Sequence, residues 1–280
     1  MSLFTINFSE NTGVIIPANK EYGNSNIGIH KSGSEINAID SGSTIMAGVE
    51  AINLIKEQYP QSKLSRLILT SSRIAHIGGS QSFTQAAVYG SALTSDLLEM
   101  PVSVESVSKL IPQNESQYKK KRFEPRQVTH KVLNDVAVDN NLQLRIAEAD
   151  TSQNLHVRCD DEKTNVAFLG SMASFGVVPL GFTANFDKWI STIEELLNED
   201  INMYVPGHGN PGGKTELSEF CQYLKACKNA NGDINNLSLG PWQEWANPEF
   251  HEINVERAHM NKNPELQEQI PNSMKRLLEN

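Results

Sequence analysis

The chain has 280 residues, of which 39% are hydrophobic and 20% are charged, so one α/β domain with a large buried core is expected. Its 24 basic and 33 acidic residues give a net charge of −9, which repels nucleic-acid phosphates and anionic membrane surfaces. These values exclude nucleic acid as an expected partner. Membrane insertion is not expected either, because no apolar run approaches the roughly 20 residues that span a bilayer.

The N-terminal segment and the cysteines indicate a cytoplasmic protein. No basic segment followed by an apolar stretch opens the chain, so we expect no export signal. Its three cysteines are too few and too irregularly spaced for a disulfide framework or a zinc knuckle, and Cys221 falls on an apolar helical stripe that predicts burial. The basic run 119–122 is predicted to be a solvated loop rather than a binding patch.

The first third of the chain predicts strands that precede a helix. The first forty residues alternate short β-rich pieces with turn residues, which is typical of hairpins. From Ile45 apolar residues recur at helical spacing, so a helix is expected over 45–58 and Pro60 limits its continuation. The mostly apolar segment 64–69 predicts another strand. Strand, helix and strand in this order indicate an α/β layered fold.

The second half of the chain repeats this pattern. Strands are predicted near 142–147, 155–159, 165–169 and 202–205. The clearest helix is 186–197, in which the apolar residues form one face of a 3.6-residue period, and a further helix is expected over 216–227. We predict one domain over 1–230 and a polar C-terminal extension over 231–280 that packs on the same domain.

Four separated segments resemble the metallo-β-lactamase-like hydrolases in the order in which they occur. The loop of that family after a buried strand is Thr-His-x-His-x-Asp-His-x-Gly-Gly, and segment 70–79 keeps its Thr, its last His and its Gly-Gly. The other three segments are Ile-Asp-Ser-Gly at 39–42, Phe-Leu-Gly-Ser at 168–171 and Tyr-Val-Pro-Gly-His-Gly at 204–209. The resemblance spans about residues 26–227.

This resemblance implies a fold and a place for metal ions. The fold is a four-layer αβ/βα sandwich, an α+β or α/β architecture in which two mixed β-sheets lie face to face with helices on the outer faces. In these enzymes two loop histidines and a third histidine hold one zinc. The loop's Asp-His pair and a closing histidine hold the other, and an aspartate bridges both.

The residues carried over to these zinc positions form a degenerate ligand set. The first-zinc position corresponds to Ser71, Arg73 and Asp150, the second-zinc position to Ala75, His76 and His208, and the bridge to Ser171. Zinc requires three or four nitrogen, sulfur or carboxylate ligands, whereas Ser71 is a poor ligand, Ala75 is none and Arg73 is permanently cationic. We therefore predict no dinuclear centre and no cofactor. The alternative left open is one weakly bound zinc or other divalent cation on His76, His208 and Asp150.

Two functions follow from these substitutions. In the first, Arg73 replaces the metal electrostatically and pairs with Asp150, while His76 or His208 acts as a general base. Ser71, Ser72 and Ser171 are then candidate hydrogen-bond donors or, alternatively, a nucleophile activated by a histidine. The protein is then a divergent hydrolase of a small ester, thioester or amide. In the second, it is an inactive family member that binds a small anionic ligand or a protein partner in the old cleft. Asp40 is expected to order the loop behind the site.

Overall fold

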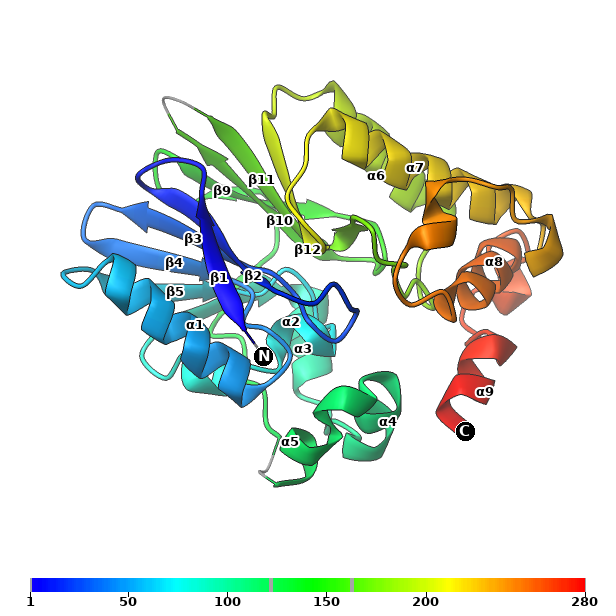
Figure 1. The fold of residues 1–280 in the computed structure, drawn as a ribbon, viewed down its shortest axis with the longest axis horizontal. Coiled ribbons are helices and arrows are strands. Elements are labelled where there is room, and N and C mark those ends of the chain that lie inside the picture. The colour runs from blue at the N-terminus through cyan, green and yellow to red at the C-terminus, as the bar shows by residue number, and fades with distance from the viewer. Residues whose placement is uncertain (1, 121–122, 162–163, 280) are drawn as a thin grey trace.

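The computed structural model describes residues 2–120, 123–161 and 164–279, in which two mixed β-sheets pack face to face with helices outside (Figure 1). This arrangement confirms the predicted four-layer sandwich. In the described residues the larger sheet consists of β1 (Leu3–Asn7), β2 (Thr12–Pro17), β3 (Ile27–Ser32), β4 (Glu35–Ile39), β5 (Lys63–Ile68), β6 (Ala87–Ser91) and β7 (His130–Val132), in that spatial order. The smaller sheet has the order β12 (Met203–His208), β11 (Asn165–Ser174), β10 (Asn154–Asp160), β9 (Leu142–Ala147) and β8 (Val136–Ala137).

Strand direction explains where the polar loops meet. Strands β1 to β4 pair antiparallel, whereas β4, β5, β6 and β7 are parallel neighbours. The carboxyl ends of parallel strands meet at the same sheet edge, so Asp40 after β4 lies next to Thr70 after β5. In the other sheet β12 runs parallel to β11 and ends at His208. The predicted site segments are thereby brought to one end of the sandwich.

Helices cover the outer faces of both sheets. The described α-helices are α1 (Ile45–Gln58), α2 (Ile74–Ile77), α3 (Ala92–Leu98), α4 (Val104–Leu110), α5 (Glu115–Lys120), α6 (Phe186–Asn198), α7 (Lys214–Asn229), α8 (Phe250–Met260) and α9 (Asn272–Glu279). Short 3₁₀ turns lie at Ser80–Ser82, Pro112–Asn114, Ile234–Asn236, Pro241–Glu244 and Pro264–Leu266. Helix α1 lies outside the larger sheet, and α6 and α7 lie outside the smaller one (Figure 1).

The two long predicted helices begin at side-chain caps. Thr44 accepts a hydrogen bond from the backbone N–H of Ala47 at the start of α1, and Asn185 caps α6 in the same way. The apolar stripe of α6 is buried, and Trp189 Nε1 donates to the Met172 carbonyl of β11 at 2.8 Å. This bond fixes α6 against the strand that precedes the site.

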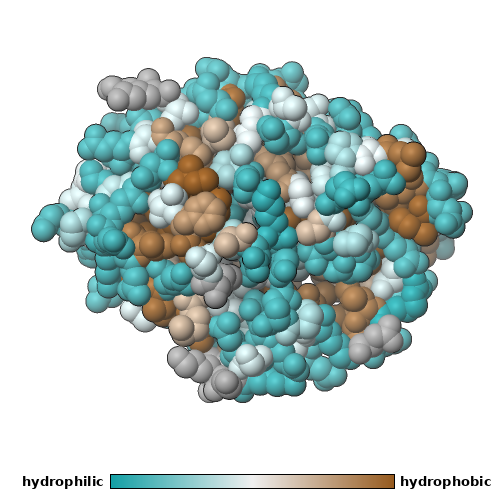
Figure 2. Space-filling view, viewed as in Figure 1, coloured by the Kyte–Doolittle hydropathy of each residue, from teal (hydrophilic) through white to brown (hydrophobic). Residues whose placement is uncertain are grey.

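Two buried clusters form the core. One lies between the sheets and draws on strands of both, and it contains Val14, Ile16, Ile39, Ile68, Leu142, Leu144, Leu155, Val157, Val166, Phe168 and Val205. The other fills the layers between each sheet and its helices, where Cys221 and Cys227 are buried as predicted for Cys221. The surface in Figure 2 is mostly hydrophilic, with separate apolar patches. No helix in the described parts of the chain is long and apolar enough to cross a membrane.

Two local expectations from the sequence are wrong. Strand β12 runs through His208, so this residue ends a strand and does not lie in the tight loop expected at 206–209. Lys119 belongs to α5 and pairs with Glu115 one helical turn earlier, so the run 119–122 is not simply a solvated loop. Residues 121 and 122 of that run lie outside the described residues. Glu115 and Lys119 are spaced for an i,i+4 ion pair, which adds a small stabilisation to this helix.

The segment after α7 folds back over the site end of the sandwich. Helix α8 packs against α7, and α9 packs against both α8 and α4. Asn254 of α8 accepts from the backbone N–H of Gly181 at 2.9 Å and donates to the Pro179 carbonyl at 2.7 Å. The C-terminal segment therefore contacts the loop that follows β11.

Candidate functional site

Asp40 orders the loop behind the site, as predicted. Its backbone is left-handed, with φ of 62°, a conformation that Asp tolerates better than most residues. Asp40 Oδ1 accepts from the Thr70 backbone N–H, and Oδ2 accepts from the Thr70 hydroxyl and lies 2.8 Å from His76 Nδ1. This contact orients the His76 ring and directs its other nitrogen, Nε2, away from Asp40.

His76 and His208 are adjacent, as the resemblance implied. Their ring centroids are 5.2 Å apart, and their exposed fractions are 0% and 3%. Neither Nε2 atom has a hydrogen-bond partner among the described residues. Gly207 allows this close approach, because a Cβ atom at that position would lie 2.5 Å from His76 Cε1.

Tyr22 covers His208. Its ring stacks on His208 with a centroid distance of 5.1 Å and an angle of 22°, and its outer edge packs against Phe250 of α8. The Tyr22 backbone N–H donates to the Asn247 side chain at 2.8 Å, which ties the loop before β3 to the C-terminal segment. The cavity that His208 and Tyr22 share with Arg73 and Asp150 has a volume of only about 10 Å³. No substrate enters a space of that size.

Burial sets the protonation of this aromatic cluster. The pKa of His208 is lowered from 6.5 to about 3, mainly by burial and also by the neighbouring His76, while a backbone hydrogen bond with Tyr22 opposes the shift. Burial also raises the pKa of Tyr22 to about 12, a shift that Arg73 opposes and Asp150 assists. Both side chains are therefore neutral near pH 7.

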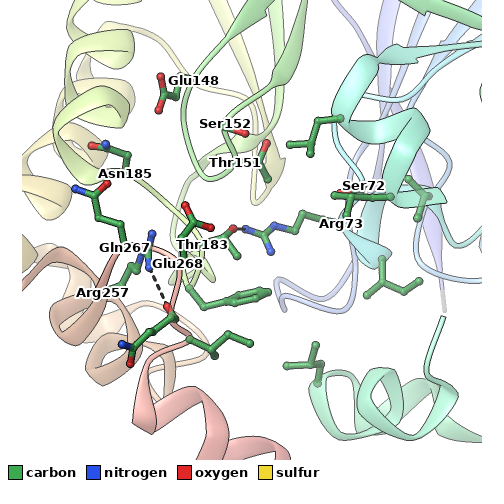
Figure 3. Close-up of a pocket in the computed structure, with 18 of the residues that line it drawn as sticks. Ser72, Arg73, Glu148, Thr151, Ser152, Thr183, Asn185, Arg257, Gln267 and Glu268 are labelled. Atoms are coloured by element: carbon green, nitrogen blue, oxygen red, sulfur yellow. Dashed lines mark hydrogen bonds between the residues drawn. The ribbon is translucent and has the colours of Figure 1, made fainter. Parts of the chain in front are cut away.

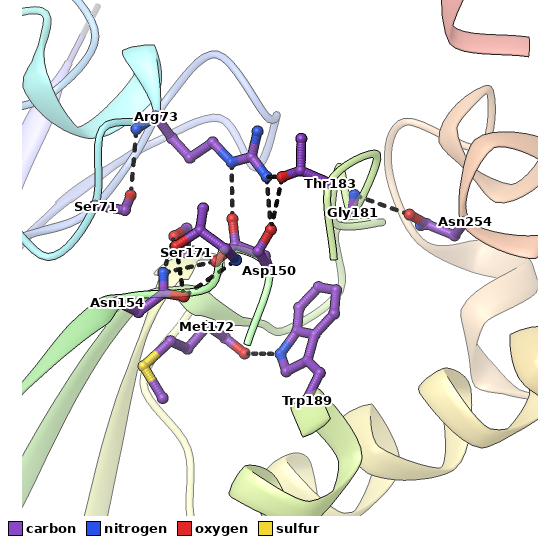
Figure 4. A network of polar contacts seen from close by, with 11 residues as sticks. Ser71, Arg73, Asp150, Asn154, Ser171, Met172, Gly181, Thr183, Trp189 and Asn254 are labelled. Atoms are coloured by element: carbon purple, nitrogen blue, oxygen red, sulfur yellow. Dashed lines mark hydrogen bonds and ion pairs between the residues drawn. The ribbon is translucent and has the colours of Figure 1, made fainter. Parts of the chain in front are cut away.

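Arg73 and Asp150 form the ion pair that the substitutions predicted (Figure 4). Arg73 Nε donates to Asp150 Oδ2 at 2.8 Å, and Nη2 donates to the Asp150 carbonyl and to the Thr183 hydroxyl, each at 2.8 Å. The guanidinium also lies 4.5 Å from the centroid of the Phe182 ring. Only 10% of the Arg73 side chain and 3% of the Asp150 side chain are exposed. These contacts therefore fix both the position of the Arg73 charge and the orientation of its guanidinium group.

The second oxygen of Asp150 is also occupied. Asp150 Oδ1 accepts from Asn154 Nδ2 at 2.7 Å and from the Ser171 hydroxyl at 2.8 Å, and Asn154 Nδ2 also approaches the Ser171 oxygen at 3.1 Å (Figure 4). Ser71, the other carried-over residue here, accepts from the Arg73 backbone N–H at 3.3 Å. Every carboxylate oxygen at the first-zinc position therefore has a protein partner.

The residues present do not fit a resident zinc. The two unpartnered histidine nitrogens are suitable donors, but zinc needs at least one more ligand, and Asp150 is committed to Arg73, Asn154 and Ser171. Among the described residues, no group of three or more His, Cys, Asp or Glu side chains is arranged to hold a metal ion. The fixed positive charge of Arg73 beside this position disfavours a cation further.

A much larger pocket opens next to this sealed cavity (Figure 3). Its volume is about 650 Å³, within the range of small-molecule sites. Arg73 and Tyr22 line both the pocket and the small cavity, so the Arg73 guanidinium joins the two spaces. Arg73 Nη1 has no hydrogen-bond partner among the described residues and is the donor left for an occupant of the pocket.

The structure brings the predicted site residues into two neighbouring groups. Arg73, Asp150 and Ser171 form one hydrogen-bonded network, and His76 and His208 form the adjacent pair. Reasoning from the sequence missed Tyr22, Asn154 and Thr183, and it also missed Arg257 of α8, which lines the pocket. Asn154 lay inside the segment compared with a family motif, but no pattern marked the other three.

Comparison with known proteins identifies the fold. No protein-family model matches the sequence, and a search of curated proteins gives no match. Among solved structures the chain is similar to TMB-1, with 18% identity and a TM-score of 0.63 over 82% of this chain and 100% of that chain. It is also similar to the DIM-1 metallo-β-lactamase (17% identity, TM-score 0.61, 80% of this chain and 98% of that chain). A third similar structure is the mono-zinc form of the FIM-1 metallo-β-lactamase from Pseudomonas aeruginosa (14%, 0.61, 80% and 96%).

These likenesses show that the chain has the metallo-β-lactamase fold, as the motifs predicted. One fold supports many activities, so the function has to be argued from the side chains of this site.

Proposed function

We propose that this protein binds a small anionic ligand in the 650 Å³ pocket beside Arg73 and works without a resident metal. The observation that carries the proposal is the Arg73–Asp150 pair at the first-zinc position, with its 2.8 Å contact and its unpartnered Nη1. A guanidinium held in place by a carboxylate, a carbonyl and a hydroxyl is pre-organised to accept an anion. The burial of the histidines supports binding rather than hydrolysis, because the cavity beside His208, of about 10 Å³, is too small for a substrate.

The test is a calorimetric titration of the full chain with acetate and benzoate, repeated with Arg73→Lys and Arg73→Gln. Arg73→Lys keeps the charge but loses the planar fork, so we expect about tenfold weaker binding, and we expect Arg73→Gln to abolish it. Arg276→Gln is the matched control, since Arg276 pairs with Glu252 on the exposed surface. Equal affinity in all four proteins contradicts the proposal.

Metal-free hydrolysis of a small ester, thioester or amide is the second candidate. It is supported by the Asp40–His76 pair, in which Asp40 orients the imidazole and leaves Nε2 without a described partner, as in other carboxylate–histidine catalytic pairs. Against it stand the full burial of His76 and the small cavity at the histidines. Assays with nitrophenyl esters and thioesters decide between the two functions. Turnover that His76→Ala and His208→Ala leave unchanged removes this candidate.

A further inference from the structure

The large pocket has one apolar and one polar wall. The apolar wall comes from α3, α4 and the turn between them, and consists of Leu93, Leu97, Leu98, Val102, Val107 and Leu110. Across the pocket from Ser72 lie the charged side chains Glu148, Arg257 and Glu268, together with amides of Asn185 and of the segment that follows α8, and Arg73 reaches into the pocket from the Ser72 side (Figure 3). A ligand that fills this space in one orientation has an apolar body and a polar end.

Arg257 is a buried cation without a carboxylate partner. It is 6% exposed, Nε donates to the Ala184 carbonyl at 2.8 Å, and Nη1 donates to the Gln269 carbonyl at 3.0 Å. It forms no ion pair with any described carboxylate, and its Nη2 has no described hydrogen-bond partner. Burial lowers the pKa of Arg257, and the nearby negative charge of Glu268 opposes that shift. Guanidinium groups nevertheless stay charged in proteins, so Arg257 is a buried charge with no carboxylate in direct ion-pair contact among the described residues.

The charge of the pocket indicates how much negative charge the ligand carries. Arg73 is already compensated by Asp150, and Glu268 lies on an exposed segment close enough to Arg257 to act on it. Glu148 also lines the pocket, so the lining carries too little positive charge for a dianion. A single negative charge next to Arg257 supplies the direct ion-pair partner that Arg257 lacks. A carboxylate also matches the planar guanidinium groups of Arg257 and Arg73, each of which keeps one Nη atom without a described partner.

We infer that the ligand is an amphipathic monocarboxylate. Its carboxylate contacts Arg257 and Arg73, and its hydrocarbon body lies on the apolar wall formed by α3 and α4. This inference rests on the proposed function and specifies the ligand class for the same pocket. Glu268 competes with the ligand carboxylate for Arg257, so removing its charge strengthens binding, whereas removing the charge of Arg257 weakens it.

The experiment is a calorimetric titration of the full chain with acetate, butyrate, hexanoate and octanoate, with octanol and octyl phosphate as probes of the polar end. Each added methylene that reaches the apolar wall is expected to raise affinity about threefold to fourfold. Octanol is expected to bind at least tenfold more weakly than octanoate, and octyl phosphate more weakly than octanoate because of its extra charge.

Two variants with opposite expected effects separate a binding role of Arg257 from a structural one. Arg257→Gln is expected to weaken octanoate binding about tenfold or more, and Glu268→Gln is expected to strengthen it about twofold to fivefold. Glu268 is exposed, so its variant folds even where Arg257→Gln does not. Arg276→Gln, outside the pocket, is expected to leave the affinity unchanged.

The outcomes of this titration distinguish the inference from the proposed function. Binding of acetate that depends on Arg73 but does not change with chain length or with Glu268→Gln overturns the inference and leaves the proposed function in place. Tighter binding of octyl phosphate than of octanoate also overturns the monocarboxylate assignment. No heat of binding with any anion overturns both.

Discussion

At the first-zinc position charged side chains are paired and reach a large pocket, whereas at the second-zinc position two histidines are buried and an aromatic ring stacks on one of them. Arg73 and Asp150 form an ion pair with a 2.8 Å contact, and Arg73 borders the 650 Å³ pocket. His76 and His208 keep nitrogens suited to metal binding, but both side chains are buried, and the cavity beside His208 has a volume of only about 10 Å³. Retained ligand residues therefore do not by themselves make a metal site. What can bind also depends on whether the site is open to solvent and on the charge of the neighbouring residues.

Removing the carboxylate of the first-zinc position is expected to have the largest effect. Asp150→Ala leaves Arg73 buried without its counter-ion and deprives Asn154 and Ser171 of their acceptor. We expect the free energy of unfolding to fall by about 3 to 5 kcal/mol, measured by urea denaturation. Asp96→Ala is the control, since Asp96 pairs with Lys131 on the surface, and it is expected to change stability by about 0.5 kcal/mol or less. Equal losses of stability in the two variants would show that the buried pair contributes no more to folding than the surface pair does.

Removing the cover of the second-zinc position is expected to have the next largest effect. Tyr22→Ala deletes a 6% exposed ring that stacks on His208, so a loss of about 3 kcal/mol in stability is expected. It also opens the histidines to diethyl pyrocarbonate, which is expected to modify them faster than in the wild type when the reaction is followed by mass spectrometry. Tyr22→Phe keeps the ring and is expected to keep them protected. Rapid modification of both histidines in the wild type would show that Tyr22 does not protect them.

Acid is expected to destabilise the folded protein through the protonation of His208, at the second-zinc position. Its folded-state pKa of about 3 lies below the ordinary value of 6.5, so the unfolded chain binds the proton more readily. The corresponding stability is fully present above about pH 6.5 and is lost toward pH 3, at about 1.4 kcal/mol per pH unit. His208→Gln is expected to remove that slope from urea denaturation curves recorded between about pH 6 and pH 4. An unchanged slope would mean that His208 is already protonated in the folded protein.

The smallest effect is expected from the bridge position. Ser171→Ala removes one hydrogen bond to Asp150, whose Oδ1 still accepts from Asn154 at 2.7 Å. A loss of about 1 kcal/mol in unfolding free energy is expected, because the carboxylate stays partnered. A loss as large as that of Asp150→Ala would assign Ser171 a larger part in holding the network.

Much of the fold could be predicted from the sequence because its signals are local. The helix predicted over 45–58 matches α1, and the apolar stripe predicted over 186–197 matches α6 to within one residue. The motif segments could also be placed together, since each follows a strand of known direction. Segment 80–132 gave no such signal, and its helices α3 and α4 depend on packing against distant parts of the chain, including α9.

The residues of the candidate site could be predicted only where they lie in one of the recognised motifs. The pairing of Arg73 with Asp150 followed from charge and position, and the structure confirms it. Tyr22 lies in a loop whose course depends on a hydrogen bond to Asn247, 225 residues later in the chain, so no local pattern reveals that it covers His208. Arg257 likewise sits on a helix of low amphipathicity and becomes part of the pocket only through the fold.

The most direct test of the account is the zinc content of untagged protein that has been incubated with excess zinc and then desalted. The account predicts far less than one zinc per chain, because Arg73 and Asp150 are bonded to each other and Tyr22 covers His208. About one retained zinc per chain, lost in His76→Ala or His208→Ala, would contradict it and would identify a mononuclear metal site in this pocket.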